Sequence, residues 1–277
     1  VLSVLIAVYS VTRLGAMEGV KYFLVPNVKN FSWMTVVAAM GQMFYSLSIA
    51  MGILITFGSY MKKETSLEDS TRNVEVFDTA IAIMAGLMII PAVFSFSGGD
   101  PDTLQAGPAL MFITIPKVFE NMGFGTVVGI LFFLLVLFAA VTSSIALTES
   151  AVSTFEDELG WSRRRATVLV GVIMIALGSL SSLGYGPLVG IKIIGMQFLD
   201  FFDFLTNSVM MPIAAMLTSL FVSRIVGMKR MEEEIMHGES TFRRKKIFIV
   251  MIKYLCPLFA AIILISSVAN AFGIITM

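Results

Sequence analysis

The sequence predicts an all-α polytopic membrane protein, and three observations support this prediction. Of the 277 residues, 57% are hydrophobic and only 14% are charged, against about 25% charged in a typical soluble domain. Basic and acidic residues number 19 each, so no net charge attracts a nucleic acid or another polyanion. Apolar runs long enough to cross a bilayer recur along the chain. These observations exclude a disordered chain, a nucleic-acid-binding protein and an ordinary soluble enzyme.

The chain opens on a short apolar stretch, VLSVLIAVYSVTRL, over residues 1–14. Its roughly twelve apolar residues are too few to cross a bilayer. It has no clear basic start or small-residue cleavage site of the kind found in a signal peptide. We therefore expect the end of a transmembrane helix that begins upstream, which would make the chain a fragment. Residues 15–33 are expected to form an extracellular loop.

Six further apolar runs have the length of complete membrane spans. They cover residues 34–60, 76–97, 125–155, 165–186, 196–223 and 247–274. The loops on one side of the membrane hold thirteen basic residues and those on the other side hold five, and basic residues accumulate in cytoplasmic loops. The sequence therefore predicts a cytoplasmic loop at 225–246, a cell-membrane location and a carboxyl terminus outside the cell.

The outer segment 98–124 contains three prolines and a short apolar stretch, LMFITI. That stretch is too short to cross a bilayer, and long loops without structure are uncommon unless they are functional. We expect a re-entrant helical hairpin on the outer face, with an ordinary loop as the alternative.

Catalytic chemistry has little support in the sequence. Cys256 is the single cysteine and His237 the single histidine. These counts exclude a disulfide within the chain, a Cys/His metal site and a histidine-based catalytic triad within the membrane. We therefore do not expect an enzyme.

Polar and small residues interrupt the predicted span 34–60. They are Gly41, Gln42, Ser46, Ser48, Gly52 and Gly58. An interrupted helix exposes carbonyls and amides that can bind ions and a carboxylate at mid-membrane depth. Close packing of small residues against a neighbouring helix explains the same pattern, and the residues alone leave both explanations open.

The span 125–155 carries a stripe of small and hydroxyl residues, which spacings of three and four place on one helix face. The stripe consists of Ala139, Thr142, Ser143, Ala146, Ser150 and Ser153. Neutral hydroxyl and carbonyl oxygens suit a weakly held monovalent cation, and close helix packing is the alternative. Glu149 is the costliest residue in this span; it either pairs within the bundle or faces water.

Three aspartates stand near span ends. Asp78 is an interfacial residue unless its helix begins earlier and carries it inward. Asp200 and Asp203 lie among phenylalanines, which suggests a vestibule or gate. The alternative is a solvent-exposed helix start, where negatively charged carboxylates interact favourably with the helix dipole.

Three stretches resemble the neurotransmitter:sodium symporter family, in particular its bacterial LeuT-type amino-acid transporters. They are GQMFYSLSIAMGILITFGSY at 41–60, GPALMFITIPKVF at 107–119 and AAVTSSIALTESAVSTFEDELGWSRRR at 139–165. The resemblance implies a LeuT-type inverted-repeat fold, of which the chain holds the second repeat plus one helix. It assigns 1–14 to the end of helix five, 34–224 to helices six to ten and 247–277 to helix eleven. The first repeat would be missing.

The resemblance also implies site residues. The substrate-binding positions are Tyr45, Ser46, Ser48, Met51, Ser143 and Leu147. The first sodium site takes Ser46 and Asp78, with Gln42 nearby. The second takes Ala139 through its carbonyl, Thr142 and Ser143. Tyr60 and Asp157 match the intracellular gate and Asp203 the outer gate, where the acids would meet arginines of the missing repeat. Each of the two Na⁺ sites would be half present.

The function implied is sodium-coupled import of a small amino acid by alternating access. Met51 stands where an aromatic residue is common, which favours a hydrophobic or aromatic substrate. Asp78 stands where asparagine is common, and Ala82 where chloride-independent relatives carry a glutamate; the charge of Asp78 therefore favours chloride independence. The expected partners are the substrate and the lipid bilayer, not nucleic acid. A proton-coupled permease of the same fold and a non-transporting sensor or scaffold remain alternatives.

Overall fold

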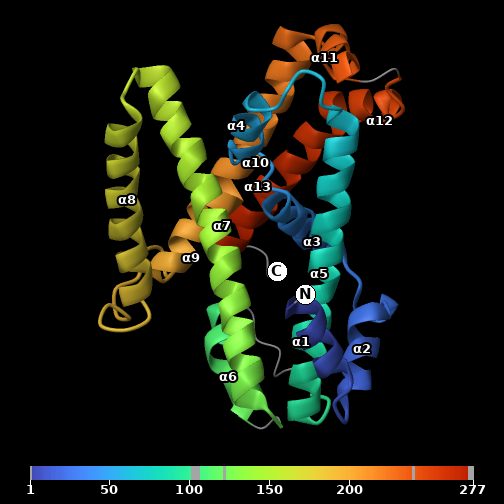
Figure 1. Ribbon diagram of the computed structural model, residues 1–277, viewed down its shortest axis with the longest axis vertical. Coiled ribbons are helices and arrows are strands. Elements are labelled where there is room, and N and C mark those ends of the chain that lie inside the picture. Colours follow the sequence, from blue (N-terminus) through green and yellow to red (C-terminus); the bar gives the residue numbers. More distant parts are fainter. Residues whose placement is uncertain (1, 101–106, 121–122, 239–240, 274–277) are drawn as a thin grey trace. The chain divides into compact units, whose positions relative to one another are not determined.

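The computed structural model describes residues 2–100, 107–120, 123–238 and 241–273. Nearly all of these residues are helical (Figure 1). The chain divides into two compact units. The first comprises Val1–Phe31 and Glu75–Ser144, and the second comprises Ser32–Val74 and Ile145–Met277.

Five helical stretches of the described chain are long and apolar enough to cross a membrane. They are α5 (Leu67–Ser97), α7 (Gly125–Leu159), α8 (Arg163–Leu183), Phe198–Val226 and Lys245–Ala271. These stretches correspond to five of the six predicted spans. A bent pair, α1 (Leu2–Val11) and α2 (Ala16–Leu24), forms a further candidate whose halves meet at 112°.

The last two spans contain wider π-helical turns. Phe198–Val226 consists of α9 (Phe198–Asp203), η4 (Phe204–Met210), α10 (Met211–Leu220) and η5 (Phe221–Val226). Lys245–Ala271 consists of α12 (Lys245–Val250), η7 (Met251–Leu255) and α13 (Cys256–Ala271). Pro212 and Pro257 are the second residues of α10 and α13, one residue after the end of a π-helical turn. A π turn changes which backbone groups pair, and this accommodates a residue that lacks an N–H.

The remaining predicted span, 34–60, is broken. α3 (Trp33–Ser46) begins at a capping box made by Ser32 and Thr35, and α4 (Ile53–Ser59) follows after six residues of turns. Ser48 and Ala50 have positive φ angles of 54° and 64°, although a left-handed conformation costs an L-residue about 1–2 kcal/mol. Of the two explanations that the sequence left open, the structure therefore contains the interrupted helix.

The first unit is built around one apolar core, drawn from α1, α5, α7 and the segment 110–120. Its buried members are Ile6, Ala7, Met88, Ala92, Val93, Ile115, Val118, Phe119, Val128 and Phe132. The segment 110–120 consists of η3 (Leu110–Thr114) and α6 (Ile115–Glu120). It is the helical part of the expected outer hairpin, and residues 101–106 and 121–122 of that hairpin lie outside the described residues. A short 3₁₀ turn, η1 (Val28–Asn30), follows α2.

The helix α2 lies very close to α5 because glycines face the contact. A Cβ added at Gly19 would stand 2.9 Å from Pro91 Cα and 3.0 Å from Ile90 O. The ring of Phe23 occupies the space beside Gly86, and Tyr22 packs on Phe94 with ring centroids 5.0 Å apart. This contact leaves no room for a side chain at Gly19.

The second unit has a core between α3, α10 and α13. It buries Val37, Phe44, Met211, Ala215, Ala260 and Ile263. Two short helices, α11 (Met228–Ile235) and η6 (Met236–Gly238), precede α12. Lys245 Nζ forms an ion pair with Glu232 Oε1 at 2.5 Å, and Glu68 Oε2 accepts a hydrogen bond of 3.1 Å from the Arg243 backbone N–H. The segment before α12 is thereby held at both α11 and the start of α5.

We predict that Gly19→Ala lowers the stability of the first unit by about 1–3 kcal/mol, because the methyl group meets backbone atoms that cannot move aside. Gly171→Ala is the matched control. Gly171 lies inside α8 with nothing within 4 Å of an added Cβ, so its replacement should be neutral or stabilising. Thermal unfolding in detergent measures both. An unchanged midpoint for Gly19→Ala would contradict the close contact.

Candidate functional site

The break between α3 and α4 contains several of the predicted substrate residues. Gln42, Tyr45 and Ser46 lie in the last turns of α3, and Ser48 and Met51 lie in the break itself. The turn is held by its own backbone, since Ser48 N donates to Tyr45 O at 3.0 Å and Ile49 N donates to Phe44 O at 3.0 Å. The chain thus places five of the predicted residues within ten positions, around backbone that does not continue the helical ladder.

The predicted second sodium site has two of its oxygens side by side on α7. The Thr142 hydroxyl donates to Ala139 O at 2.9 Å and to Phe138 O at 3.1 Å. Because the hydroxyl is the donor, its lone pairs remain available, and the Ala139 carbonyl keeps its second lone pair. Thr142, Ser143 and Ala139 are all exposed in the described chain. This group of neutral oxygens suits a monovalent cation.

Asp78 lies well inside its helix. α5 begins at Leu67, eleven residues earlier, and at a rise of 1.5 Å per residue this corresponds to about 16 Å. Asp78 is half-buried. α5 therefore begins earlier than the predicted span 76–97, and Asp78 does not stand at the helix start.

The predicted sites combine residues of both units. Asp78 and Ser143 belong to the first unit, and Ser46 and Leu147 to the second. The pairing of Ser46 with Asp78 in one sodium site, and of Ser143 with Leu147 in one pocket, therefore stays a prediction.

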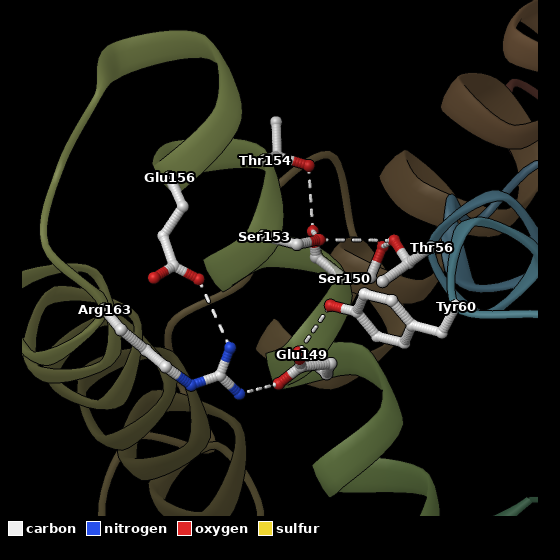
Figure 2. A network of polar contacts seen from close by, with 8 residues as sticks. All are labelled: Thr56, Tyr60, Glu149, Ser150, Ser153, Thr154, Glu156 and Arg163. Atoms are coloured by element: carbon white, nitrogen blue, oxygen red, sulfur yellow. Dashed lines mark hydrogen bonds and ion pairs between the residues drawn. The ribbon is translucent and has the colours of Figure 1, made fainter.

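A polar network joins the end of α4 to α7 and α8 (Figure 2). The Tyr60 hydroxyl donates to Glu149 Oε1 at 2.7 Å. Arg163 forms ion pairs with Glu149 Oε2 at 2.5 Å and with Glu156 Oε2 at 3.2 Å. The Arg163 side chain is 59% exposed and that of Glu149 20%, so water screens the pair and its contribution stays below about 1 kcal/mol. Glu149 thus pairs within the bundle, one of its two expected placements.

Arg163 is the member of this network that the sequence did not reveal, because the sequence showed it only as one of three arginines in a basic loop. The available signal was the cost of Glu149, which calls for a nearby cation, and that loop supplies the next basic residues along the chain. Asp157, the predicted gate acid, is exposed, and its side chain has no hydrogen bond or ion pair within the part of the chain described.

The predicted outer gate lies at the end of α9. Asn207 Nδ2 donates to Asp203 Oδ1 at 2.5 Å, which fixes the carboxylate against the following turn. In the loop before α9, burial and then the neighbouring Asp200 carboxylate raise the pKa of Tyr185. The two acids, one helical turn apart, therefore have different neighbours.

Long apolar helices, a broken span and an exposed group of neutral oxygens are the features of a multi-pass membrane protein with a candidate ion site. The chain belongs to the Sodium:neurotransmitter symporter family, which matches residues 1–274. That membership confirms the predicted family and places the chain among secondary transporters rather than enzymes.

Individual relatives agree with this assignment. The chain is 32% identical over 275 residues to the uncharacterized sodium-dependent transporter YhdH of Bacillus subtilis, covering 99% of this chain and 59% of the relative. It is 32% identical over 259 residues to an uncharacterized sodium-dependent transporter of Haemophilus influenzae, covering 93% of this chain and 55% of the relative.

A solved structure, that of MhsT in complex with L-phenylalanine, superposes with a TM-score of 0.82 at 34% identity. The match covers 96% of this chain and 59% of that one, which confirms the predicted all-helical LeuT-type fold. The chain thus spans a little over half the length of the relatives it matches.

We predict that Tyr60 and Glu149 are energetically coupled. Tyr60→Phe and Glu149→Ala should each destabilise the protein, and the double variant should lose about 0.5–1 kcal/mol less than the sum, because both changes remove the same hydrogen bond. Denaturant or thermal unfolding in detergent measures the cycle. Tyr254→Phe is the matched control, since Tyr254 is 67% exposed on another helix. Strict additivity would show that the contact contributes nothing.

Proposed function

We propose that the protein uses a sodium gradient to import a small, hydrophobic or aromatic amino acid by alternating access. The observation that carries this proposal is the break between α3 and α4, with left-handed residues at Ser48 and Ala50. A break at mid-span frees backbone carbonyls that can hold the amine of an amino acid inside the membrane. Tyr45 lies just before the break and Met51 within it, and both would form the apolar wall of the pocket.

The sodium ions would bind at two places. One takes Ser46 and Asp78 together with the substrate carboxylate, and Gln42 lies near it. The other takes the Ala139 carbonyl with Thr142 and Ser143, whose oxygens are adjacent on α7. A carboxylate shared between substrate and ion couples the two, because each then binds better when the other is present. Such coupling is typically about 1–3 kcal/mol.

The choice of a hydrophobic or aromatic substrate rests on two observations. Methionine at position 51 is flexible and polarizable and adapts to bulky apolar groups. MhsT, which is similar to this chain, was solved with L-phenylalanine. We propose the same substrate class here, completed by Ser143 and Leu147 on α7.

The proposed half-sites would be completed outside this chain. Because the matched relatives are longer, we propose that a segment corresponding to the rest of their length supplies the remaining ion and substrate ligands. The same segment would carry the arginines that face Asp157 on the inner side and Asp203 on the outer side. The excess of basic residues in the loops 61–75, 156–165 and 224–246 favours a cell-membrane protein with its carboxyl terminus outside.

The test of this function is uptake of labelled phenylalanine into liposomes that contain the full-length polypeptide. We expect accumulation under an inward sodium gradient and none under a potassium or proton gradient. Thr142→Val keeps the side-chain shape and removes one sodium ligand, so the sodium concentration for half-maximal uptake should rise about tenfold, as expected for the loss of one oxygen ligand worth about 1.4 kcal/mol. Thr206→Val, which removes a hydroxyl bonded within its own helix, is the control. Proton-driven uptake without sodium would favour the permease instead.

We also predict that transport is independent of chloride because Asp78 supplies a fixed negative charge. Asp78→Asn should make uptake depend on chloride, since a bound anion would then have to replace the lost carboxylate. Uptake is compared in chloride and gluconate buffers at constant sodium. The same chloride response in the native protein and in Asp78→Asn would refute this role of Asp78.

A further inference from the structure

The short helix α4 uses a single face to contact α7. Thr56 lies within α4, and Gly52 and Tyr60 are the residues that cap its two ends. Their spacing of four residues places all three on one side of the helix. Each contacts the same part of α7, at Glu149 or Ser150. At seven residues, α4 is too short to be stable as a helix by itself. Its position therefore depends on this face.

The upper part of that face is a buried cluster of hydroxyl groups (Figure 2). Thr56 and Ser150 are each only 8% exposed. The Thr56 hydroxyl donates to Ser150 Oγ at 3.4 Å, and it lies 3.4 Å from Ser153 Oγ. The Ser153 hydroxyl donates a hydrogen bond to the Ser150 backbone carbonyl at 3.1 Å. A Cβ added at Gly52 would stand 2.7 Å from Ser150 Oγ, so the two helices touch with no larger side chain between them.

These contacts are close in space but weak. Hydroxyl–hydroxyl hydrogen bonds are normally about 2.7–2.8 Å long, whereas both bonds of Thr56 are 3.4 Å. Within the described residues, Ser150 Oγ accepts from Thr56 and donates to no acceptor. Burying a hydroxyl costs free energy that only a good hydrogen bond recovers. The cluster therefore holds α4 on α7 less firmly than apolar packing of the same shape would.

We propose that Thr56, Ser150 and Ser153 are positioning residues that keep the contact between α4 and α7 weak enough to be released during transport. The inference rests on the proposed function: alternating access requires the site to open toward each side in turn, and we take separation of α4 from α7 as the movement that this contact controls. Tyr60 and Glu149 close the exposed end of the contact, and the hydroxyl cluster sets how readily the buried end separates.

The sign of each substitution follows from the hydrogen bonds. We call the arrangement in which α4 contacts α7 closed. Thr56→Val keeps the side-chain shape but removes the donor, which leaves the buried Ser150 hydroxyl oxygen without a partner in the closed arrangement. The population of the closed arrangement should therefore fall. Thr56→Val with Ser150→Ala removes both partners, and an apolar pair of similar shape is neutral or stabilising. The second substitution should therefore reverse the effect of the first.

The experiment measures the distance between the segment that directly follows α4 and the start of α8, in the full-length protein in nanodiscs. Nitroxide labels at Lys62→Cys and Arg164→Cys, both exposed, are placed in a Cys256→Ser background, and pulsed dipolar spectroscopy gives the fractions of short and long distances. We expect Thr56→Val to shift the ratio toward long distances by about two- to tenfold, the size of one net hydrogen bond. The double variant should return the ratio to the native value or beyond it.

Three variants keep the test decisive. Thr154→Val is the matched control, since Thr154 donates to Ser150 O within its own helix at 2.8 Å and is exposed; it should leave the ratio unchanged. Thr56→Ser retains the donor and should behave as the native protein. If Thr56→Val does not fold, Ser150→Val places a methyl group toward Gly52 and should open the contact by itself.

Equal ratios in native protein and Thr56→Val, or additive effects in the double variant, would overturn the proposal. The distances do not depend on uptake. A protein that fails to transport but shows the expected shifts would refute the proposed function and leave the hydroxyl cluster supported. Normal sodium-driven uptake without the distance shifts would support the proposed function and refute the role of the hydroxyl cluster.

Discussion

The constraint on which this structure depends is that a backbone inside a lipid bilayer must satisfy its own polar groups. Long uninterrupted helices such as α7 and α8 satisfy this constraint through their own backbone hydrogen bonds. The break between α3 and α4 does not, because six residues there leave the helical ladder. Such a break is stable only where protein, an ion or a substrate supplies the lost partners. The same requirement that makes the break costly makes it a candidate binding site.

Small residues allow helices to approach where the structure needs close contact. In the first unit, Gly19 and Gly86 bring α2 against α5. In the second, Gly52 brings α4 against Ser150 of α7. The two contacts differ in what surrounds them. Around Gly19 the neighbours are apolar side chains and backbone, which favours a fixed contact. Around Gly52 they are hydroxyl groups with long hydrogen bonds, which favours a contact that can separate.

The charged residues near the ends of the spans form local networks whose strength depends on exposure. Glu149 holds both Tyr60 and Arg163, so one carboxylate connects three helices. Because Arg163 is largely exposed, this network contributes specificity of position more than stability. It can therefore form and dissociate at small cost, which suits the proposed alternation between two arrangements.

The sequence alone determined the class of the fold, because spans and loops follow from hydropathy and charge. It also showed that Glu149 was the costliest residue of its span and that the span 34–60 was unusual. It could not decide whether that span breaks, since glycine and serine serve packing and interruption equally well; the left-handed backbone at Ser48 and Ala50 appears only in three dimensions. Nor could it identify Arg163, or the spacing of Gly52, Thr56 and Tyr60 as a contact face. Pairing between helices depends on which faces meet, and that is decided by tertiary packing rather than by any local pattern.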